Sequence, residues 1–574
     1  MGSGEMITTH TNIIIVGASI EGLVLARALE RYDVDVRLLE AEKAPAHEPK
    51  ALLLYARTLE LLDSINLAKP LMETGAAYRS LEFNYEGKKI FTPAFDFLKK
   101  ESYYPLVLSM ANCDMQRVLR RALLKTSVEW GTRITHLKQN GLKTEAIIES
   151  NNMDERVVAD YIVGADGIES AVRQLAAIKC KMDKGSELMM ADVQTKQQLT
   201  NNAPTMTFNK RGIMFAVDLP GHQARVMMVD RGKPNARREN TEVSLQELYQ
   251  KITGHILPMQ TTVNMQSKQA VFHQAKEFRA GDVFLVGEAA HAHHPMTSQS
   301  VNLGIQDSIN LSWKLGMVCV RACPETLLDS YEAERLPVAK KVNRTTDWTI
   351  RSLTVHKPVA VQARDRTLKI VEMIERLPEA FIRRLSHLSV RYRASAPALK
   401  EELRREGVLR PGDRVPDAVL TDFENQTTRL YEHLQEGKFL FVMRTSGSRI
   451  DKEYAFIKRW LRKSAPYFGD MVQPALVAPT PTMGQPDDIL CWSERYLSRD
   501  FRRLIGPGES MLVRPDGYLL FHSDAAGWSD WKDAVELFLA AGAEWNLEEQ
   551  ETGKWRQSIK SISRRWKKQL TFSR

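Results

Sequence analysis

The 574-residue sequence lacks the features that would assign it to a specialised class of protein. No segment approaches the roughly 18 consecutive apolar residues of a membrane-spanning helix, and no secretory signal opens the chain. The five cysteines are few and scattered, which argues against a disulfide framework and for a cytoplasmic location. With 43% hydrophobic and 26% charged residues, the composition is that of a globular protein, and the length predicts about two to four domains.

Ligands for a metal ion are also scarce. Cys319 and Cys323 lie one helical turn apart, without His, Asp or Glu at ligand spacing around them. We therefore expect core thiols here and no metal site.

Excess positive charge is missing from all but one segment. The net charge is +9, and residues 554–574 contain eight Lys or Arg and no acid, which leaves +1 for the rest. The bulk of the chain therefore gives no reason to expect nucleic acid.

In the tail, apolar residues recur with helical spacing, as in a basic amphipathic helix that binds an anionic membrane surface or an acidic partner. Packing against its own domain, or against a second subunit of a homodimer, is the alternative. The residues on this face are Trp555, Ile559, Ile562, Trp566 and Leu570.

What the sequence does contain begins with a strand–turn–helix–strand pattern. The apolar run at 12–16, the turn "GASIEG", a helix-favouring stretch and a second apolar run at 34–40 predict a βαβ unit. In G-x-G-x-x-G the first glycine makes a tight turn and the third lets helix pack on strand. Gly17 and Gly22 keep those places, whereas Ser19 stands where backbone approaches a pyrophosphate. Glu40 ends the second strand, where a carboxylate accepts from ribose hydroxyls. A packing turn without a nucleotide is the alternative.

Further along the chain the pattern changes. Alternating runs over 181–276 predict a mostly antiparallel layer, and "AGDVFLVGEAAH" (280–291) returns to a buried strand. Helical spacing follows, including an exposed charged helix over "LDSYEAERLPVAKKV". The Pro- and Gly-rich "GVLRPGDRVPDAVL" marks a domain boundary. Near the end, "RPDGY" lies between two apolar runs, and its Asp516-Gly517 pair predicts a hairpin turn.

Several motifs resemble those of one family. "DYIVGADGIESAVR" (160–173) and "VFLVGEAAHAHHP" (283–295), together with the N-terminal turn, are similar to the flavoprotein aromatic hydroxylases, typified by p-hydroxybenzoate and phenol hydroxylases. "KALLLYARTLELLD" and "DSYEAERLPVA" resemble further family segments. "GDRVPDAVL" and "LVRPDGYLLFH" resemble the thioredoxin-like domain of the phenol hydroxylase branch.

The resemblance implies an α/β fold made of three domains and a tail. A Rossmann-like FAD-binding domain would span 11–180 and 277–404, the latter with a helical extension, and an antiparallel β substrate domain would span 181–276. A thioredoxin-like α/β domain would follow at 405–545, and the basic tail at 546–574. Its Cys-x-x-Cys position reads "TSGS" (445–448), so we expect a structural role and no disulfide exchange.

The family's cofactor residues can be carried over position by position. Gly17, Ser19 and Gly22 would lie against the FAD pyrophosphate, and Glu40 would hold the adenosine ribose. Asp166 and Gly167 belong to a motif used beside FAD and NAD(P)H. The remaining positions would surround the flavin, with Glu288 at the ribityl chain and a helix N-terminus facing the pyrimidine end; they are Lys50, Asn112, Gly287, Glu288, Pro295, Ser300, Val301 and Asn302.

The same segment departs from the family pattern G-D-A-A-H-x-H-P-P-T-G-G-Q-G-x-N. Asp becomes Glu288, the first Pro becomes His294, and the three glycines become Thr297, Ser298 and Ser300. Elsewhere Lys50 replaces an Arg, which removes a bidentate grip on phosphate, and Asn112 replaces a Gln. Added side chains beside a flat ring either crowd it or supply hydrogen bonds.

By resemblance, the chain is an FAD-dependent monooxygenase that takes electrons from NAD(P)H. Reduced FAD would react with O2 to a C4a-hydroperoxide, which hydroxylates an aromatic or polyketide-like molecule.

Six methionines of the β layer would line an apolar pocket, with core packing as the alternative. His294 is a candidate general base, whereas we expect packing and hydrogen bonding for His291 and His293. The alternative functions are a non-redox step such as cyclisation, with FAD structural or lost, and a non-catalytic scaffold. The methionines are Met189, Met190, Met206, Met214, Met227 and Met228.

Overall fold

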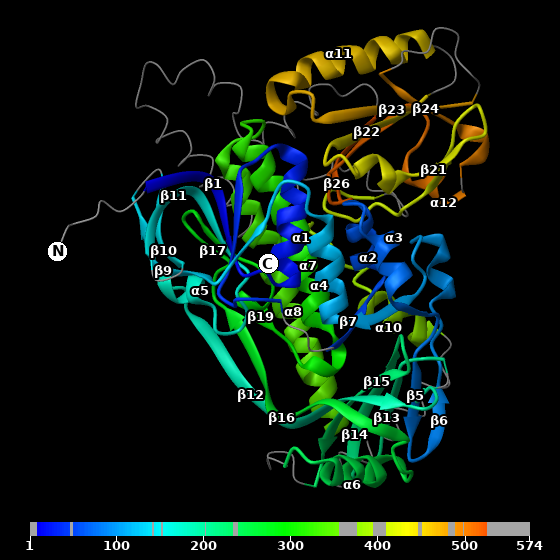
Figure 1. Cartoon of the computed structure of the whole chain (residues 1–574). Helices are drawn as coiled ribbons and strands as arrows, with labels where there is room; N and C mark the ends of the chain where they lie inside the picture. Colours follow the sequence, from blue (N-terminus) through cyan, green and yellow to red (C-terminus); the bar gives the residue numbers. More distant parts are fainter. Residues whose placement is uncertain are drawn as a thin grey trace, which may run out of the picture. The chain divides into compact units, whose positions relative to one another are not determined.

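The computed structural model describes residues 8–45, 50–140, 143–150, 153–200, 202–232, 239–354, 376–393, 409–445, 450–479, 488–497 and 499–524 (Figure 1). The predicted amphipathic helix at 554–574 lies outside these ranges. The chain divides into two compact units, one of Met1–Gly316 with Arg335–Val390 and one of Met317–Glu334 with Arg391–Arg574. No helix within the described ranges is both long enough and apolar enough to cross a membrane.

The first unit opens with the predicted βαβ unit. β1 (Thr8–Val16) pairs in parallel with β2 (Val36–Glu40), and α1 (Ile20–Leu29) connects them. Every residue of α1 except Arg27 is buried, as expected for a helix that is apolar on nearly all sides. On its other edge β1 pairs in parallel with β11 (Met153–Gly164). The Rossmann-like part of the predicted fold is therefore confirmed.

The complete sheet has the order β17-β18-β11-β1-β2-β8, with β10 and β9 branching from β11. Its parallel strands all end at one edge, where Gly17 N donates to Leu39 O (2.7 Å), Ala165 N to Val16 O (2.8 Å) and Val286 N to Gly164 O (3.0 Å). Three loops far apart in sequence thus meet at the carboxyl edge of the sheet, where open α/β folds bind their ligands. The other strands are β8 (Val128–Trp130), β9 (Thr132–Gln139), β10 (Thr144–Ser150), β17 (Arg279–Ala280) and β18 (Val283–Leu285).

A second sheet of eight strands has the order β19-β16-β12-β15-β14-β13-β5-β6. Its two longest strands, β12 (Cys180–Thr195) and β16 (Met259–Ala275), run antiparallel, and so do β13–β14, β14–β15 and β12–β15. The predicted antiparallel layer is confirmed. The sheet also takes in two short strands from 82–91, which the sequence did not predict, and β13 pairs in parallel with the first of them. These strands are β5 (Glu82–Tyr85), β6 (Lys88–Phe91), β13 (Thr205–Phe208), β14 (Gly212–Leu219), β15 (Gln223–Asp230) and β19 (His291–Ala292).

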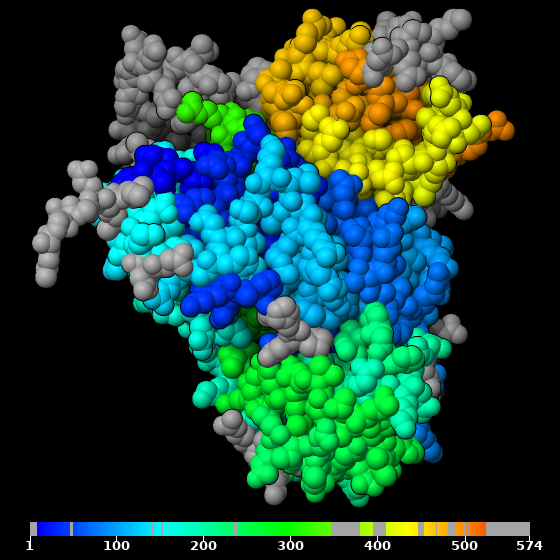
Figure 2. Space-filling model, in the orientation of Figure 1, coloured from blue at the N-terminus to red at the C-terminus, as the bar shows by residue number. Residues whose placement is uncertain are grey.

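One face of this sheet is covered by α6 (Glu242–Thr253). The helix begins where Thr241 Oγ1 accepts a hydrogen bond from Ser244 N (3.2 Å), and ends at Gly254, whose φ is +80°. Leu245, Leu248 and Ile252 turn inward onto the strands. In the space-filling view α6 and the neighbouring strands form the green surface at the lower end of this unit (Figure 2).

A small antiparallel sheet, β3-β7-β4, and a set of helices complete the first unit. Long helix α7 (Gln299–Cys319) packs on the N-terminal segment, because Gly316 leaves space for the Tyr32 ring, which would lie 2.3 Å from an added Cβ. The exposed helix predicted over 328–342 is wrong in part: α8 (Asp329–Thr354) buries Arg335 fully. The remaining elements are β3 (Ala51–Leu54), β4 (Ala76–Tyr78), β7 (Val107–Ala111), α2 (Ala56–Asp63), α3 (Ala68–Thr74), α4 (Asn112–Ala122), α5 (Ala171–Leu175) and α10 (Arg376–Leu385).

The second unit contains a five-stranded sheet of order β24-β23-β22-β25-β26 and a β20–β21 pair. Trp460 of α11 (Ile450–Phe468) stacks on Phe441, with ring centroids 4.3 Å apart. The predicted hairpin turn is confirmed, because Gly517 N donates to Arg514 O (2.8 Å) and Gly517 has a φ of +75°. The thioredoxin-like assignment stays a prediction, and residues 446–448 of "TSGS" lie outside the described ranges. The strands are β20 (Val419–Thr421), β21 (Thr427–Arg429), β22 (Phe439–Arg444), β23 (Val472–Ala478), β24 (Leu490–Ser493), β25 (Glu509–Val513) and β26 (Leu519–Asp524).

Candidate functional site

The turn between β1 and α1 depends on its two glycines. Gly17 has a φ of +104°, and a Cβ there would lie 2.4 Å from Ala165 O. A Cβ on Gly22 would lie 2.0 Å from Gly17 O. Because both contacts are with backbone, no side chain can move aside to accept a larger residue. Glycine is therefore required at both positions of this turn.

Ser19, the odd residue of this motif, caps the helix. Its Oγ accepts a hydrogen bond from Gly22 N (3.2 Å), and its backbone is extended as at an ordinary N-cap. The substitution therefore strengthens the start of α1. The other amides of this first turn, with the positive end of the helix dipole, remain suited to a phosphate.

Glu40 stands beside this turn, as the sequence predicts. Its Oε2 accepts from Ala18 N (2.8 Å) and its Oε1 from Glu42 N (3.1 Å). The carboxylate thereby joins the end of β2 to the glycine turn. Each oxygen keeps a second lone pair, which leaves acceptor capacity for a ribose hydroxyl.

Asp166 and Gly167 follow β11 at the same edge of the sheet. Asp166 Oδ2 accepts from Val172 N (3.0 Å), whereas Oδ1 is buried without a hydrogen-bond partner. Burial raises the pKa of Asp166 above its ordinary value, although hydrogen bonds from Ser170 and the following amides oppose the effect. Gly167 has a φ of +77° and open space beside it. A buried acceptor next to open space suits a hydroxyl or amide of a ligand.

Lys50 and Asn112 meet where β3 begins and β7 ends. Asn112 N donates to Lys50 O (2.7 Å), while Asn112 Oδ1 is buried without a partner. Lys50 also acts electrostatically on Glu288, so these residues, more than 200 positions apart, share one neighbourhood. Lys50 and Glu288, two positions at which this chain differs from the family pattern, therefore lie in the same part of the site.

Gly287 and Glu288 lie on a short 3-10 turn (Gly287–Ala289) after β18. Gly287 N donates to Asp307 Oδ2 (3.2 Å). Burial raises the pKa of Glu288, and His291, Lys268, the Ser300 hydroxyl and Lys50 offset part of that rise. Glu288 is therefore an acidic group held among basic neighbours.

The segment that lost its family glycines keeps a glycine-like backbone at one place. Ser298 has a φ of +50°, in the left-handed region that side chains rarely adopt. Thr297 Oγ1 donates to His294 O (2.9 Å), and Ser300 Oγ accepts from His293 N (2.9 Å). Both hydroxyls thus bind the protein's own backbone, in a turn that Pro295 begins.

Asn302 holds the start of α7 against β3 and α2. Its Nδ2 donates to Leu53 O and Ser298 O (2.7 Å each), and its Oδ1 accepts from Tyr55 N (3.0 Å). The amide is fully engaged, so its role in the structure is to position the turn. Ser300 and Val301, which precede it, belong to the first turn of α7.

A buried charge network that sequence reasoning missed supports this segment. Asp307 Oδ2 meets His291 Nε2 and Oδ1 accepts from Arg335 Nε, both at 2.6 Å. Burial by itself raises the pKa of Asp307, but Arg335 and His291 outweigh it and hold the pKa below its ordinary value. The expectation of hydrogen bonding for His291 is confirmed. The available signal was the polar pair "QD" inside an apolar helix, since a buried charge needs a partner.

His294, the candidate general base, is fully buried beside Phe272, with ring centroids 5.8 Å apart. Its Nδ1 accepts from Met296 N (3.3 Å), and its Nε2 is buried without a partner. Burial lowers the pKa of His294 to about 4. The ring is therefore neutral at pH 7, and the hydrogen bond from Met296 N places its proton on Nε2. In that tautomer the ring has no free acceptor for a substrate proton.

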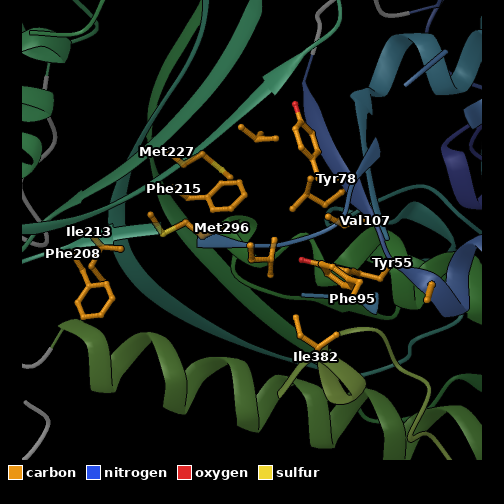
Figure 3. Packing of buried hydrophobic residues seen from close by; sticks show 14 of the residues in the cluster. Tyr55, Tyr78, Phe95, Val107, Phe208, Ile213, Phe215, Met227, Met296 and Ile382 are labelled. Carbon is orange, nitrogen blue, oxygen red and sulfur yellow. The ribbon is translucent and has the colours of Figure 1, made fainter. Parts of the chain in front are cut away.

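The six methionines divide between the two faces of the second sheet. Because side chains alternate along a strand, Met189, Met214 and Met228 face α6 in one core cluster. Met190, Met206 and Met227 face the opposite cluster, which contains aromatic residues and Met296 next to the substituted turn. Figure 3 shows Phe215 and Met227 from the second sheet opposite Tyr78 and Val107 from the small sheet, with Tyr55, which directly follows β3. All six methionines thus pack in apolar clusters, three on each face of the sheet.

These observations test whether the residues fit an FAD. The site combines a closed glycine turn at the N-terminus of α1 with two buried acceptors that lack a hydrogen-bond partner, Asp166 Oδ1 and Asn112 Oδ1. An apolar cluster completes it. This donor set fits a dinucleotide carrying a ring system. Among the described residues, no group of three or more His, Cys, Asp or Glu is placed to hold a metal ion.

Comparison with known proteins agrees with this geometry. The FAD binding domain family model matches residues 10–346. Pentachlorophenol 4-monooxygenase from Sphingobium chlorophenolicum is 26% identical over 523 residues, covering 88% of this chain and 93% of that protein. For 6-methylpretetramide 4-monooxygenase from Streptomyces rimosus the identity is 26% over 545 residues, covering 90% and 91%.

Solved structures share the fold. The anhydrotetracycline hydroxylase OxyS from Streptomyces rimosus superposes with a TM-score of 0.71 at 24% identity, covering 93% of this chain and 100% of that one. The Diels-Alderase PyrE3 of pyrroindomycin biosynthesis superposes with a TM-score of 0.67 at 21% identity, covering 92% and 98%. Since one fold carries a hydroxylase and a Diels-Alderase, the fold alone leaves the reaction open.

Proposed function

The chain belongs to the FAD binding domain family, and from this premise we propose that it is an FAD-dependent monooxygenase of an aromatic or polyketide-like molecule. The observation that carries the proposal is the meeting of the glycine turn, Asp166 and the 287–302 segment at one edge of the parallel sheet. Relatives called monooxygenases align over about nine-tenths of the chain. NAD(P)H is the proposed electron donor and O2 the proposed co-substrate.

Each part of FAD has a proposed set of contacts. Gly17, Ser19 and Gly22 would take the pyrophosphate at the α1 N-terminus, and Glu40 the adenosine ribose. Glu288 would take the ribityl chain, with Lys50 beside it. Asn112, Asp166 and Gly167 would offer their unused acceptors and open space, and the first turn of α7 would face the flavin ring. Bound FAD would supply the transfer of electrons and the activation of oxygen.

The chain's own residues would orient the substrate and exclude water. The aromatic and methionine side chains of the cluster around Phe215 and Met227 are proposed to pack against a flat apolar ring system. His294 Nε2–H is proposed as a hydrogen-bond donor and not as a base, because the lone pair of its Nδ1 already accepts from Met296 N. No group in this region is therefore assigned to remove a substrate proton.

The absorption spectrum of the purified protein, before and after adding FAD, tests the proposal. We expect flavin bands near about 450 nm that NADH or NADPH bleaches and O2 restores. A panel of phenols and polycyclic aromatics, analysed for addition of one oxygen atom, would then identify the substrate. Persistent bands that neither reductant bleaches would favour the non-redox alternative, cyclisation. A protein that binds no added FAD would exclude both flavin roles and leave two alternatives, a non-redox step without FAD and a non-catalytic scaffold.

A homodimer and membrane or partner contact through 554–574 remain proposals of their own. Co-sedimentation with anionic liposomes, measured for the full chain and for a variant that lacks residues 551–574, tests the membrane contact. If the tail makes this contact, the shortened variant no longer binds the liposomes. Analytical ultracentrifugation of the full chain tests the dimer.

A further inference from the structure

Glu21 is an acidic residue inside the glycine turn, and the fold makes room for it. It occupies the first turn of α1, yet only 8% of the residue is exposed. A Cβ on Gly287 would lie 2.6 Å from Glu21 Cγ, and a Cβ on Gly304 would lie 2.5 Å from the same atom. Two glycines from separate elements therefore accommodate this one side chain, as expected for a built feature of the site.

The main charged groups that act on Glu21 are acidic. They are Glu288 and Asp307, and its hydrogen bonds are with Ser19 and its own backbone. The two neighbours do have basic partners: Lys50, Lys268 and His291 act on Glu288, and Arg335 and His291 act on Asp307. Glu21 thus differs from these two neighbours in that the main charge effects on it come from carboxylates.

Its protonation follows from this setting. Burial, and then Glu288, raise the pKa of Glu21 to about 7, although Ser19 and the backbone amide oppose the rise. A diphosphate at the α1 N-terminus adds negative charge to the same neighbourhood. It can only raise the pKa further, because like charges favour the neutral acid.

We propose that Glu21 meets the diphosphate of FAD as a neutral carboxylic acid, so that FAD binding is coupled to the uptake of one proton. The carboxyl O–H would donate to a phosphate oxygen, where an ionised Glu21 would repel it. This inference rests on the proposed function, since it requires FAD to bind at the glycine turn.

The first test measures the Kd of FAD by quenching of flavin fluorescence from pH 6 to pH 9. For the wild-type protein we expect Kd to rise by as much as about tenfold per pH unit above pH 7, as one-proton linkage requires. In Glu21→Gln the side chain is neutral at every pH, so its Kd stays flat across the range. The matched control is Glu42→Gln, an exposed carboxyl near the same turn, which keeps the wild-type slope. A wild-type slope in Glu21→Gln overturns the inference.

A second test works without FAD. A carboxyl whose folded pKa is raised stabilises the fold below its unfolded pKa, near 4.5, and that contribution is lost as pH rises through about 7. Glu21→Gln should therefore raise the Tm of the apoprotein at pH 8.5 and leave it nearly unchanged at pH 5.5. An equal Tm shift at both pH values overturns the inference. The expected Tm difference can be found even if neither the wild type nor Glu21→Gln binds FAD. In that case the proposed function is wrong, whereas the neutral state of Glu21 in the folded protein is supported.

Discussion

The turn at Gly17–Gly22 and the segment at 294–302 both build the candidate site, and they differ in why glycine is needed. In the first, an added Cβ would run into backbone at 2.4 Å or closer. In the second, three family glycines are replaced, and Ser298 adopts a glycine-like φ of +50° with a side chain in place. Glycine is indispensable where space is missing and replaceable where only the dihedral angle is unusual.

The two regions also differ in what holds them. The first turn closes by backbone contacts, with Gly17 O inside the turn and with Ala165 O after β11. The second is held by side chains from distant elements, with Asp307, His291 and Arg335 beneath it and Asn302 beside it. We therefore expect the second region to be the more sensitive to loss of a buried charge.

The largest effect is expected for Asp307→Asn, which removes the charge between His291 and Arg335. Leaving Arg335 buried without its carboxylate should cost about 3–5 kcal/mol, measured by urea unfolding at pH 7. Because the folded pKa of Asp307 is lowered, its contribution is present above the unfolded pKa and is lost as pH falls through the folded pKa. The difference between variant and wild type should thus shrink in acid. Asp33→Asn, which breaks an exposed pair with Lys125, is the control. Equal losses in the two variants would refute the role of the network.

A smaller loss is expected for Gly22→Ala. The new Cβ would lie 2.0 Å from Gly17 O, and shifting backbone to relieve this contact should cost about 2–3 kcal/mol. FAD affinity should fall as well, because the helix N-terminus moves. Gly87→Ala is the matched control: its φ is +76° but nothing lies within 4 Å, so only strain of about 1 kcal/mol remains. If both variants unfold at the same urea concentration, space is not what the turn requires.

The smallest effects test the second region from within. Ser298→Gly should stabilise the protein by about 0.5 kcal/mol, since relief of left-handed strain exceeds the entropy that glycine adds to the unfolded chain. Ser300→Gly should instead destabilise by about 1 kcal/mol, because Ser300 Oγ accepts from His293 N. Opposite signs in thermal denaturation would support the distinction between the two replaced glycines. Two shifts of the same sign would contradict it.

Sequence reasoning reached the βαβ unit, the antiparallel layer and the hairpin at 514–517, because each depends on local pattern. The resemblance to the flavoprotein hydroxylases placed the loops at 17–22, 166–167 and 287–302 around one cofactor. It did not foresee β5 and β6 in the second sheet, whose short and partly exposed strands carry little periodic signal. From the sequence, pocket lining and core packing were both possible for the six methionines. The structure places three of them on each face of the sheet, because side chains alternate along a strand.

The sequence by itself determined the membership of the family, through its motifs, and the need for glycine at Gly22, because the steric limit there comes from Gly17 O in the same turn. The limit at Gly17 comes from Ala165 O, which only the tertiary structure brings beside it. Only the tertiary structure decided how charges are paired. Asp307 meets His291 and Arg335 from 16 and 28 residues away, and Lys50 comes near Glu288. Glu21 lies between Gly287 and Gly304, with Glu288 and Asp307 as the main charged groups that act on it. Burial sets the cost of each charge, and burial is a property of packing between distant segments.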